Sequence, residues 1–445
     1  MSIEINCEIC NKSFKNNSLL KKHKCKLEEL VVDDFSKTSK TITEKIGSVE
    51  KSDEGIFFTP PSIINKCINS VLEIDGINIK SILEPSCGSC EFITKLNSVF
   101  KNVKITGVEK NNTIYDEIKN IKFDKKNGNT IELIHSNFLT LIIDKKYDLI
   151  IGNPPFFVMK KQDVDSQYYD MFEGRPNIYI IFIIICLSKL NENGVLIFVL
   201  PLNFTNCLYY NKLRTYIYLN YKIIDIVDCR DDTYIDTQQD TIYIVIQNIV
   251  IQNNKTDIEN NNKKFAMKKD EYIIFNTEKN IEKLNELYKN STNLFKMDFD
   301  VSVGTVVWNK VRDLLSDDAT LTQLIYSSDI QNNQLIMKTY KDEDKKNYID
   351  KDGLSDPVLV LNRGYGKGSY VLNYCLINMT KKYLIENHLI SIKYTKPGSK
   401  ELLIEKYNTI IKSFDNPKTK EFINIYFGNN AINTTELKYI LPIYL

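Results

Sequence analysis

The sequence lacks the features that mark exported or membrane-spanning proteins. Its longest apolar stretch, which contains residues 179–187 (YIIFIIICL), is far shorter than the roughly 20 residues that a helix needs to cross a bilayer. We therefore expect a buried helix there. Residues 1–6 contain neither a basic segment nor an apolar one. We expect no export and no membrane partner, and an intracellular location, either cytoplasmic or associated with the nucleoid.

An excess of charge of one sign is also missing. The 58 Lys and Arg residues nearly balance the 57 Asp and Glu residues, which leaves a formal net charge of +1. No overall positive field would draw this chain to nucleic acid, so any such binding must come from local patches.

Glycine and proline are few, with 16 and 11 residues, and the hydrophobic (43%) and charged (26%) contents are ordinary. These values exclude a collagen-like fibre, a wholly disordered chain and a disulfide scaffold. The ten cysteines are irregularly spaced, and we expect them to be reduced thiols. A length of 445 residues predicts two domains, with room for a small appendage.

The segment CEICNKSFKNNSLLKKHKC, residues 7–25, differs in composition from the rest of the chain. It has the parts of a small zinc finger, namely two close thiols, two apolar residues and two later ligands. The predicted zinc ligands are Cys7, Cys10, His23 and Cys25. A single residue separates His23 from Cys25, where such fingers leave three to five, so the alternative is a basic, solvated helix.

Short apolar runs alternate with helical patterns from residue 55 to residue 248. The strand candidates are ILEP, KITGVE, YDLIIGNPP, GVLIFVLP, KIIDIV and TIYIVIQN. This alternation predicts an α/β fold, a doubly wound and mostly parallel sheet of the Rossmann type, followed by a mixed α/β domain. The expected divisions are a finger-like segment 1–28, a linker 29–52, a catalytic domain 53–255, a connecting region 256–298 and a carboxyl-terminal domain 299–445.

Two of these strands end in features that suit a cofactor containing a nucleoside. The string ILEPSCGSCEF, residues 82–92, ends a strand with an acid and a turn that contains glycine, where backbone amides can approach a ligand. The strand KITGVE delivers Glu109 to its carboxyl end. A carboxylate there can accept hydrogen bonds from both hydroxyls of a ribose. The alternative for each is an ordinary strand and turn.

The string DLIIGNPPF, residues 148–156, carries the most specific chemistry. The two prolines fix the backbone and remove donors, which leaves the Asn153 carboxamide and the Pro154 carbonyl as rigid acceptors. Two such acceptors can hold a planar amino group and make its nitrogen more nucleophilic toward a methyl sulfonium. Phe156 would stack on the ring that bears the amine.

In these motifs and their order, the chain resembles the gamma-class N6-adenine DNA methyltransferases of restriction–modification systems. The resemblance covers roughly residues 55–246. It implies S-adenosylmethionine as cofactor, double-stranded DNA as partner and a carboxyl-terminal target-recognition domain, and a cognate nuclease would be a separate protein. The implied cofactor contacts are Phe58, Thr59, Glu84, Pro85, Ser86, Gly88, Glu109, Asn137 and Phe138. The implied catalytic residues are Asn153, Pro154, Pro155 and Phe156.

The same resemblance implies that the target adenine leaves the duplex and is gripped between Phe156 and Tyr234. Two positions depart from the family's pattern. Cys90 stands where the family commonly has glycine, and Asn137 where it has aspartate. We expect both changes to lower cofactor affinity at most.

The string VLVLNRGYGKGSYV, residues 358–371, offers a Gly-rich turn with basic and aromatic side chains. Arg363, Tyr365 and Lys367 are therefore candidate DNA contacts, with a structural hairpin as the alternative. The motifs of the whole chain also leave two other functions open. One is methylation of RNA adenine or protein glutamine, and the other is a catalytically inactive DNA-binding module.

Overall fold

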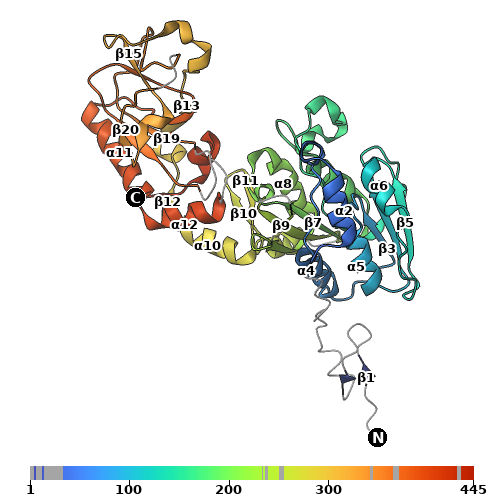
Figure 1. The fold of residues 1–445 in the computed structure, drawn as a ribbon. Helices are drawn as coiled ribbons and strands as arrows, with labels where there is room; N and C mark the ends of the chain where they lie inside the picture. The colour runs from blue at the N-terminus through green and yellow to red at the C-terminus, as the bar shows by residue number, and fades with distance from the viewer. Residues whose placement is uncertain are drawn as a thin grey trace. The chain divides into compact units, whose positions relative to one another are not determined.

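The computed structural model describes residues 34–232, 234–235, 239–249, 255–340, 344–363, 370–427 and 432–445, together with the short strands β1 (Ile5–Asn6) and β2 (Ser13–Phe14). The chain divides into two compact units, Met1–Ile281 and Glu282–Leu445 (Figure 1). Each unit has its own sheets and is described separately.

A seven-stranded sheet with the order β5-β4-β3-β6-β7-β9-β8 forms the centre of the first unit. Its strands are β3 (Ser81–Glu84), β4 (Lys104–Glu109), β5 (Thr130–His135), β6 (Tyr147–Gly152), β7 (Leu190–Pro201), β8 (Lys222–Asp228) and β9 (Thr241–Gln247). Only β9 runs antiparallel to its neighbours, β7 and β8. The chain first builds outward from β3 to β5 and then resumes on the other side of β3 with β6. This arrangement confirms the predicted doubly wound, mostly parallel sheet, with its switch point between β3 and β6.

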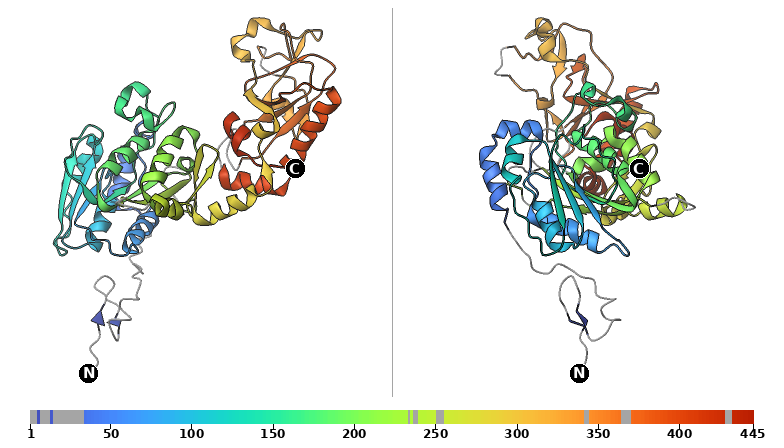
Figure 2. Two further views of the ribbon diagram at one scale, coloured as in Figure 1. Left: turned by 180° about the vertical axis from the view of Figure 1, so that it is seen from behind. Right: turned by 90° about the vertical axis from the view of Figure 1, so that its right-hand side faces the viewer.

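Side chains of the central strands alternate between two hydrophobic clusters, one on each face of the sheet. Ile82 and Leu149 belong to one cluster, whereas Leu83 and Ile150 belong to the other. The first face is covered by α2 (Lys37–Lys45), α4 (Pro61–Leu72), α5 (Glu91–Val99) and α6 (Asn112–Ile118), and the second by α7 (Ile178–Ser188) and α8 (Asn211–Asn220). Figure 2 shows these helices on both sides of the sheet.

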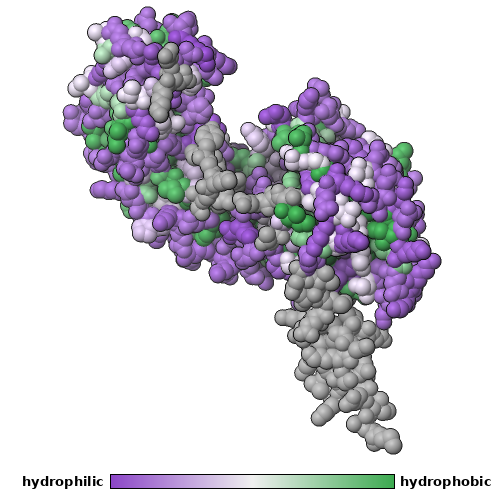
Figure 3. All heavy atoms as spheres, viewed as in Figure 1, coloured by the Kyte–Doolittle hydropathy of each residue, from purple (hydrophilic) through white to green (hydrophobic). Residues whose placement is uncertain are grey.

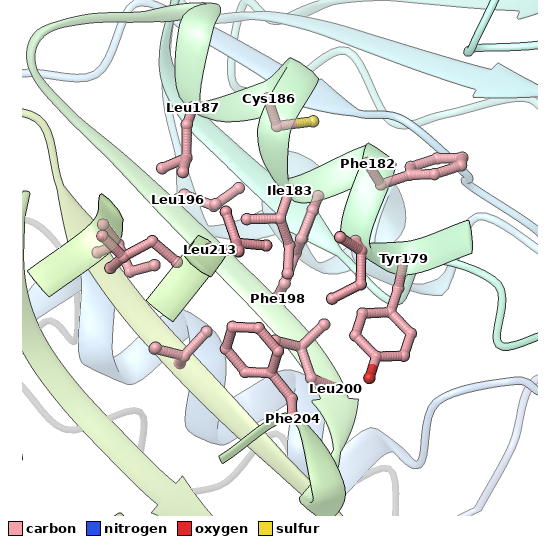
Figure 4. Close-up of a cluster of buried hydrophobic side chains, with 14 of the residues drawn as sticks. Tyr179, Phe182, Ile183, Cys186, Leu187, Leu196, Phe198, Leu200, Phe204 and Leu213 are labelled. Carbon is pink, nitrogen blue, oxygen red and sulfur yellow. The ribbon is translucent and has the colours of Figure 1, made fainter. Parts of the chain in front are cut away.

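Helix α7 contains the apolar stretch that the sequence analysis assigned to a buried helix, and this prediction is confirmed. Its side chains are buried around nearly the whole helix rather than along one stripe. Phe182 and Ile183 belong to the same cluster as Leu196 and Phe198 of β7 (Figure 4). No helix among the described residues is both long and apolar enough to cross a membrane.

The predicted linker 29–52 and the predicted connecting region 256–298 both contain regular structure. Residues 29–52 include α2 and most of α3 (Ser48–Glu54), and Ile42 and Ile46 of the first linker lie in the core. Residues 256–298 include most of α9 (Lys255–Asn262), the hairpin of β10 (Ala266–Lys269) and β11 (Tyr272–Phe275), and α10 (Glu278–Tyr288). The boundary between the units therefore falls within α10 and not at residue 299.

Helix α9 was not predicted, because its segment is rich in asparagine and resembles a polar loop in composition. One of these asparagines, however, has a structural role. The Asn262 side chain is fully buried, and its Nδ2 donates to the carbonyls of Tyr218 and Tyr221, at 2.9 and 2.8 Å. Its Oδ1 accepts from the Ile223 amide at 2.8 Å. A buried polar residue with satisfied hydrogen bonds cannot be distinguished from a loop asparagine by composition.

The second unit contains two four-stranded sheets with the orders β13-β22-β19-β20 and β14-β18-β15-β21. Their strands are β13 (Phe299–Val303), β14 (Leu315–Ser316), β15 (Thr322–Ile325), β18 (Tyr348–Ile349), β19 (Val358–Asn362), β20 (Tyr374–Ile377), β21 (Tyr383–Ile385) and β22 (Leu389–Tyr394). Helices α11 (Lys400–Phe414) and α12 (Pro417–Tyr426) follow. The mixed α/β character predicted for this part of the chain is confirmed.

The described surface of both units is mainly hydrophilic on the face that Figure 3 presents, with hydrophobic residues in small separate groups. Ile142 and Val371 are among the large hydrophobic side chains that are exposed, and they lie in different units. Single exposed hydrophobic residues of this kind are normal on a folded protein.

Candidate active site

A cavity in the first unit lies at the carboxyl ends of the parallel strands. Its lining includes a residue just beyond each of four strands: Pro85 after β3, Lys110 after β4, Ser136 after β5 and Asn153 after β6. This is the crevice where doubly wound sheets bind ligands. The sequence-predicted residues that line it are Phe58, Pro85, Ser86, Gly88, Glu109, Asn137, Phe138, Asn153 and Pro155. The structure therefore brings the predicted cofactor motifs and the catalytic motif to one cavity.

The charged residues of the lining are Glu54, Glu109 and Lys110, so acids outnumber bases there. S-adenosylmethionine carries a sulfonium and an ammonium group against one carboxylate, and a lining with more acids than bases suits its net positive charge. The apolar part of the wall includes Phe138 and Phe182, whose ring centroids lie 5.0 Å apart.

The turn after β3 brings backbone close to this cavity. Gly88 has a φ of +49°, and a Cβ there would lie 3.3 Å from the Phe58 ring. Glycine is favoured both by the left-handed backbone and by the limited space. A close approach of backbone to ligand is what the sequence predicted for this turn.

Cys90 stands where the resembled family commonly has glycine, but its side chain does not crowd the cavity. It has a φ of +63° and is the N-cap residue of α5. Its side chain is fully buried in the core cluster and does not line the cavity. The cost of the substitution is therefore local strain of about 1 kcal/mol, because a side chain disfavours left-handed backbone.

Glu109 lies at the end of β4, and backbone amides hold both of its carboxylate oxygens. Oε2 accepts from the Gly88 amide at 2.9 Å, and Oε1 accepts from the Asn111 amide at 2.7 Å. Burial raises the pKa of this carboxyl group, while the hydrogen bonds from the amides act in the opposite direction. Each oxygen keeps a second lone pair, so the group fits the ribose role that the sequence predicted.

Asn111 connects Glu109 to helix α3, a connection that was not predicted from the sequence. Its Nδ2 donates to Glu50 Oε1 and to Glu54 Oε2, each at 3.0 Å, and its Oδ1 caps α6 by accepting from the Ile114 amide at 3.1 Å. An asparagine before a helical pattern signals the cap. The partners on α3 could not be predicted, because that segment was assigned to a linker.

Glu84 is nearly fully buried but does not line the cavity, and its Oε2 has no hydrogen-bond partner among the described residues. Desolvation by burial raises the pKa of this carboxyl group well above its ordinary value. Thr59, also predicted to touch the cofactor, is buried outside the lining as well. Both residues lie next to lining residues in the chain, Pro85 and Phe58.

Asn137 lines the cavity, and its side chain makes a hydrogen bond to the backbone two residues further along the chain. Its Oδ1 accepts from the Leu139 amide at 3.1 Å. This side-chain oxygen, part of a predicted cofactor contact, is therefore shared with the backbone.

The Asn153 carboxamide is hydrogen-bonded at its Nδ2 end only. Nδ2 donates to the Phe57 carbonyl at 2.9 Å, whereas the buried Oδ1 has no partner among the described residues. The backbone carbonyl of Asn153 accepts from the Ser86 hydroxyl at 3.2 Å. A buried acceptor without a partner costs free energy, and such an atom at a cavity is typical of a binding site.

Phe156 and Tyr234, the two residues predicted to grip a base, pack against different clusters. The Phe156 ring makes an edge contact with Tyr179, with centroids 5.8 Å apart, on the α7 face of the sheet. Tyr234 is buried in the cluster on the opposite face, and its hydroxyl lies 3.3 Å from Thr241 Oγ1. In the described arrangement, the structure does not bring the two rings together.

Several predicted residues lie outside the described part of the chain. They are Cys7, Cys10, His23, Cys25, Tyr365 and Lys367. Arg363 is described, and it directly follows β19 with a half-buried side chain. Within the described ranges, no group of three or more His, Cys, Asp or Glu residues could hold a metal ion.

This chain resembles known proteins, some over its central part and others over almost its full length. Residues 78–235 match the family described as Eco57I restriction-modification methylase. The chain is 26% identical over 414 residues to Type II methyltransferase M.CvrRI of Paramecium bursaria Chlorella virus XZ-6E, which covers 91% of this chain and 98% of that protein. It is 27% identical over 418 residues to Modification methylase CviBIII of Paramecium bursaria Chlorella virus NC1A, which covers 92% and 99%.

A shorter similarity extends to bacteria. Type II methyltransferase M.AccI of Acinetobacter calcoaceticus is 27% identical over 168 residues, which covers 36% of this chain and 30% of that protein. The family match and the two relatives that align over almost the whole chain support a methyltransferase of the restriction–modification type.

Proposed function

We propose that this protein is a site-specific DNA methyltransferase that uses S-adenosylmethionine to methylate the N6 amine of an adenine flipped out of the duplex. The observation that carries the proposal is the buried Oδ1 of Asn153, a residue that lines the cavity, because this oxygen has no hydrogen-bond partner among the described residues. An exocyclic amine is the partner that this acceptor lacks. The relatives that align over nearly the whole chain are named as type II methyltransferases or as a modification methylase, which favours DNA over RNA or protein as the substrate.

The residues of the cavity fit the proposed cofactor. Glu109 would accept the ribose hydroxyls, and the Gly88 turn would lie close to the methionine part. Phe138 and Phe182 offer an apolar wall for an adenine ring. When bound, S-adenosylmethionine supplies a methyl group that its sulfonium makes electrophilic.

The work of the protein's own residues would be to hold and orient the amine. Asn153 Oδ1 and the Pro154 carbonyl would accept hydrogen bonds from its two N–H groups, which draws the nitrogen lone pair out of conjugation with the ring. Pro154 and Pro155 would keep these acceptors from moving, because each proline fixes φ. Phe156 would stack on the base, and Ser86 would tie the cofactor turn to the catalytic motif through the Asn153 carbonyl.

Methyl transfer from tritiated S-adenosylmethionine to unmethylated duplex DNA, RNA and protein, assayed in parallel, tests the proposal. We expect label in DNA, in the form of N6-methyladenine, and sequencing of the methylated DNA would give the recognition site. Asn153→Ala is expected to abolish the transfer while cofactor binding measured by calorimetry remains. Label in RNA or protein alone would contradict the proposed substrate.

The segment of residues 7–25 adds a second, smaller proposal. We infer from its cysteine and histidine spacing that Cys7, Cys10, His23 and Cys25 bind one structural zinc ion. Arg363, Tyr365 and Lys367 remain proposed DNA contacts of the second unit, on the strength of their Gly-rich context in the sequence.

A further inference from the structure

Residues 55–58, between α3 and α4, lie directly against the catalytic motif. Gly55 ends α3 with a φ of 65°. A Cβ at this position would lie 2.4 Å from the Phe156 backbone nitrogen and 3.0 Å from the Phe156 carbonyl carbon. Backbone atoms cannot yield as the end of a flexible side chain can, so any residue other than glycine would push the two segments apart.

Two residues further on, the Phe57 carbonyl accepts the hydrogen bond from Asn153 Nδ2. A carboxamide has nearly the same shape when it is turned over, but its donor and acceptor ends exchange places. A carbonyl oxygen can face only the NH2 end favourably, because two oxygen acceptors repel each other. The Phe57 carbonyl therefore decides which way round the Asn153 side chain lies.

The orientation matters because the other end of the carboxamide has no partner of its own. Asn153 Oδ1 is buried and makes no hydrogen bond to the described residues, so nothing on that side holds it as an acceptor. In the turned-over state, Asn153 would present NH2 to the incoming amine, and two donors would face each other.

We propose that Gly55 and Phe57 are positioning residues for methyl transfer: the close approach at Gly55 places the Phe57 carbonyl so that Asn153 Oδ1 points at the amine as an acceptor. The inference rests on the proposed function. It adds a role for the segment before α4 that is separate from cofactor contact. Neither residue takes part in bond formation.

The first test compares Gly55→Ala with two matched glycine variants. Gly76 has a φ of +72° with no heavy atom within 4 Å of its potential Cβ, so Gly76→Ala has the left-handed strain without the contact to Phe156. Gly47 is equally open, and its φ of −66° is ordinary, so Gly47→Ala should keep the wild-type kcat and lose only a little stability through a poorer N-cap of α3. We measure kcat with DNA and cofactor both saturating, cofactor Kd by calorimetry, and the midpoint of thermal unfolding.

We expect kcat of Gly55→Ala to fall by about 10-fold to 100-fold, the size of effect that small misplacements of reacting groups produce. Gly76→Ala should lose less stability than Gly55→Ala, because it has the left-handed strain without the clash with the Phe156 backbone, and it should keep the wild-type kcat. Cofactor binding to Gly55→Ala should remain measurable. Equal kcat in Gly55→Ala and Gly76→Ala would overturn the inference, and so would a Gly55→Ala variant whose only defect is lost cofactor binding.

A second variant tests the hydrogen bond itself. Asn153→Asp keeps an acceptor for the amine, but its ionised form cannot donate to the Phe57 carbonyl. When protonated, it can donate to Phe57 and still accept through its other oxygen. We therefore expect the activity of Asn153→Asp, relative to wild type, to rise as the pH falls from about 8.5 to about 5.5, toward the range where carboxyl groups protonate.

Relative activity of Asn153→Asp that stays constant, or that increases toward high pH, would contradict the inference. If Asn153→Asp is inactive at every pH tested, the inference is decided by the kcat values of Gly55→Ala and Gly76→Ala. All variants are assayed on whichever of DNA, RNA or protein the wild type methylates. A wild type that methylates RNA or protein but not DNA would therefore refute the proposed substrate without affecting the test of Asn153 orientation.

Discussion

The Ser86 hydroxyl donates a hydrogen bond to the backbone carbonyl of Asn153, with 3.2 Å between the two oxygens. Ser86 belongs to the turn after β3, and Asn153 follows β6, so this contact joins the Gly88 turn to the Asn-Pro-Pro-Phe string across the switch point of the sheet. The two loops are therefore linked by a side chain as well as by the sheet below them.

Removing this link should reduce catalysis more than stability. One hydrogen bond contributes roughly 0.5–1.5 kcal/mol, so we expect Ser86→Ala to lower kcat by about 2-fold to 10-fold. Ser98→Ala is the matched control, because the Ser98 hydroxyl is exposed and bonds only locally, to the Lys95 carbonyl. Steady-state kinetics of both variants would refute this role of Ser86 if they gave the same kcat.

Asn111 should control cofactor affinity through its three side-chain hydrogen bonds. Asn111→Asp has the same shape but places a third carboxylate beside Glu50 and Glu54, where like charges repel. We expect S-adenosylmethionine to bind at least about 10-fold more weakly, measured by calorimetry, since two charge-assisted bonds are lost. Adding Glu50→Gln should recover part of the loss. Unchanged affinity in Asn111→Asp would show that α3 does not support the ribose acid.

Glu84 should make the stability of the protein depend on pH. Its pKa in the folded state is raised by burial, so in the unfolded state the group loses its proton at a lower pH. Stability is then highest below the unfolded pKa and falls as the pH rises toward the folded pKa. Glu84→Gln removes this dependence. We expect the midpoint of thermal unfolding of the cofactor-free variant to exceed that of wild type by an amount that grows between about pH 5 and pH 8.

A constant difference between the two unfolding midpoints over that range would mean that Glu84 is ionised in the folded protein. Glu405→Gln serves as the control, since Glu405 lies in α11 of the second unit and is exposed. Its midpoint should follow that of wild type at every pH.

Variants of Tyr234 can show whether its ring is part of the core, as in the structure, or stacks on the target adenine, as the sequence predicted. A fully packed aromatic ring contributes heavily to stability, so Tyr234→Ala should destabilise the protein by about 3–5 kcal/mol in denaturant unfolding. Tyr234→Phe, which loses only the contact with Thr241, should cost about 1 kcal/mol and keep its activity. If Tyr234 stacks on the target base instead, Tyr234→Ala would lose activity with little change in stability.

The proposed zinc ion can be tested by elemental analysis of the full chain. We expect about one zinc per chain in wild type and none in the double variant Cys7→Ser with Cys10→Ser, because thiolates are strong zinc ligands. The variant Cys186→Ser changes a buried cysteine of α7 and should keep its zinc. Equal zinc in all three proteins would contradict the assignment of these ligands.

Much of the fold followed from local patterns in the sequence. The strands that became β3, β4, β6, β7, β8 and β9 were all predicted, because buried strands of a parallel sheet are continuous apolar runs that end in turn residues. Helices α2, α3 and α9 were missed, since short helices with mostly polar surfaces show little apolar periodicity.

The sequence by itself determined the chemistry of the site, namely an acid at the end of one strand, a glycine turn after another and an Asn-Pro-Pro-Phe string after a third. Such motifs are local, and the order of strands in a doubly wound sheet brings them to one edge. Only the tertiary structure decided how Asn153 is turned, which helix supports Glu109 and where Tyr234 packs. These depend on contacts between residues far apart in the chain, such as Phe57 with Asn153 and Glu50 with Asn111, for which a single sequence carries no local signal.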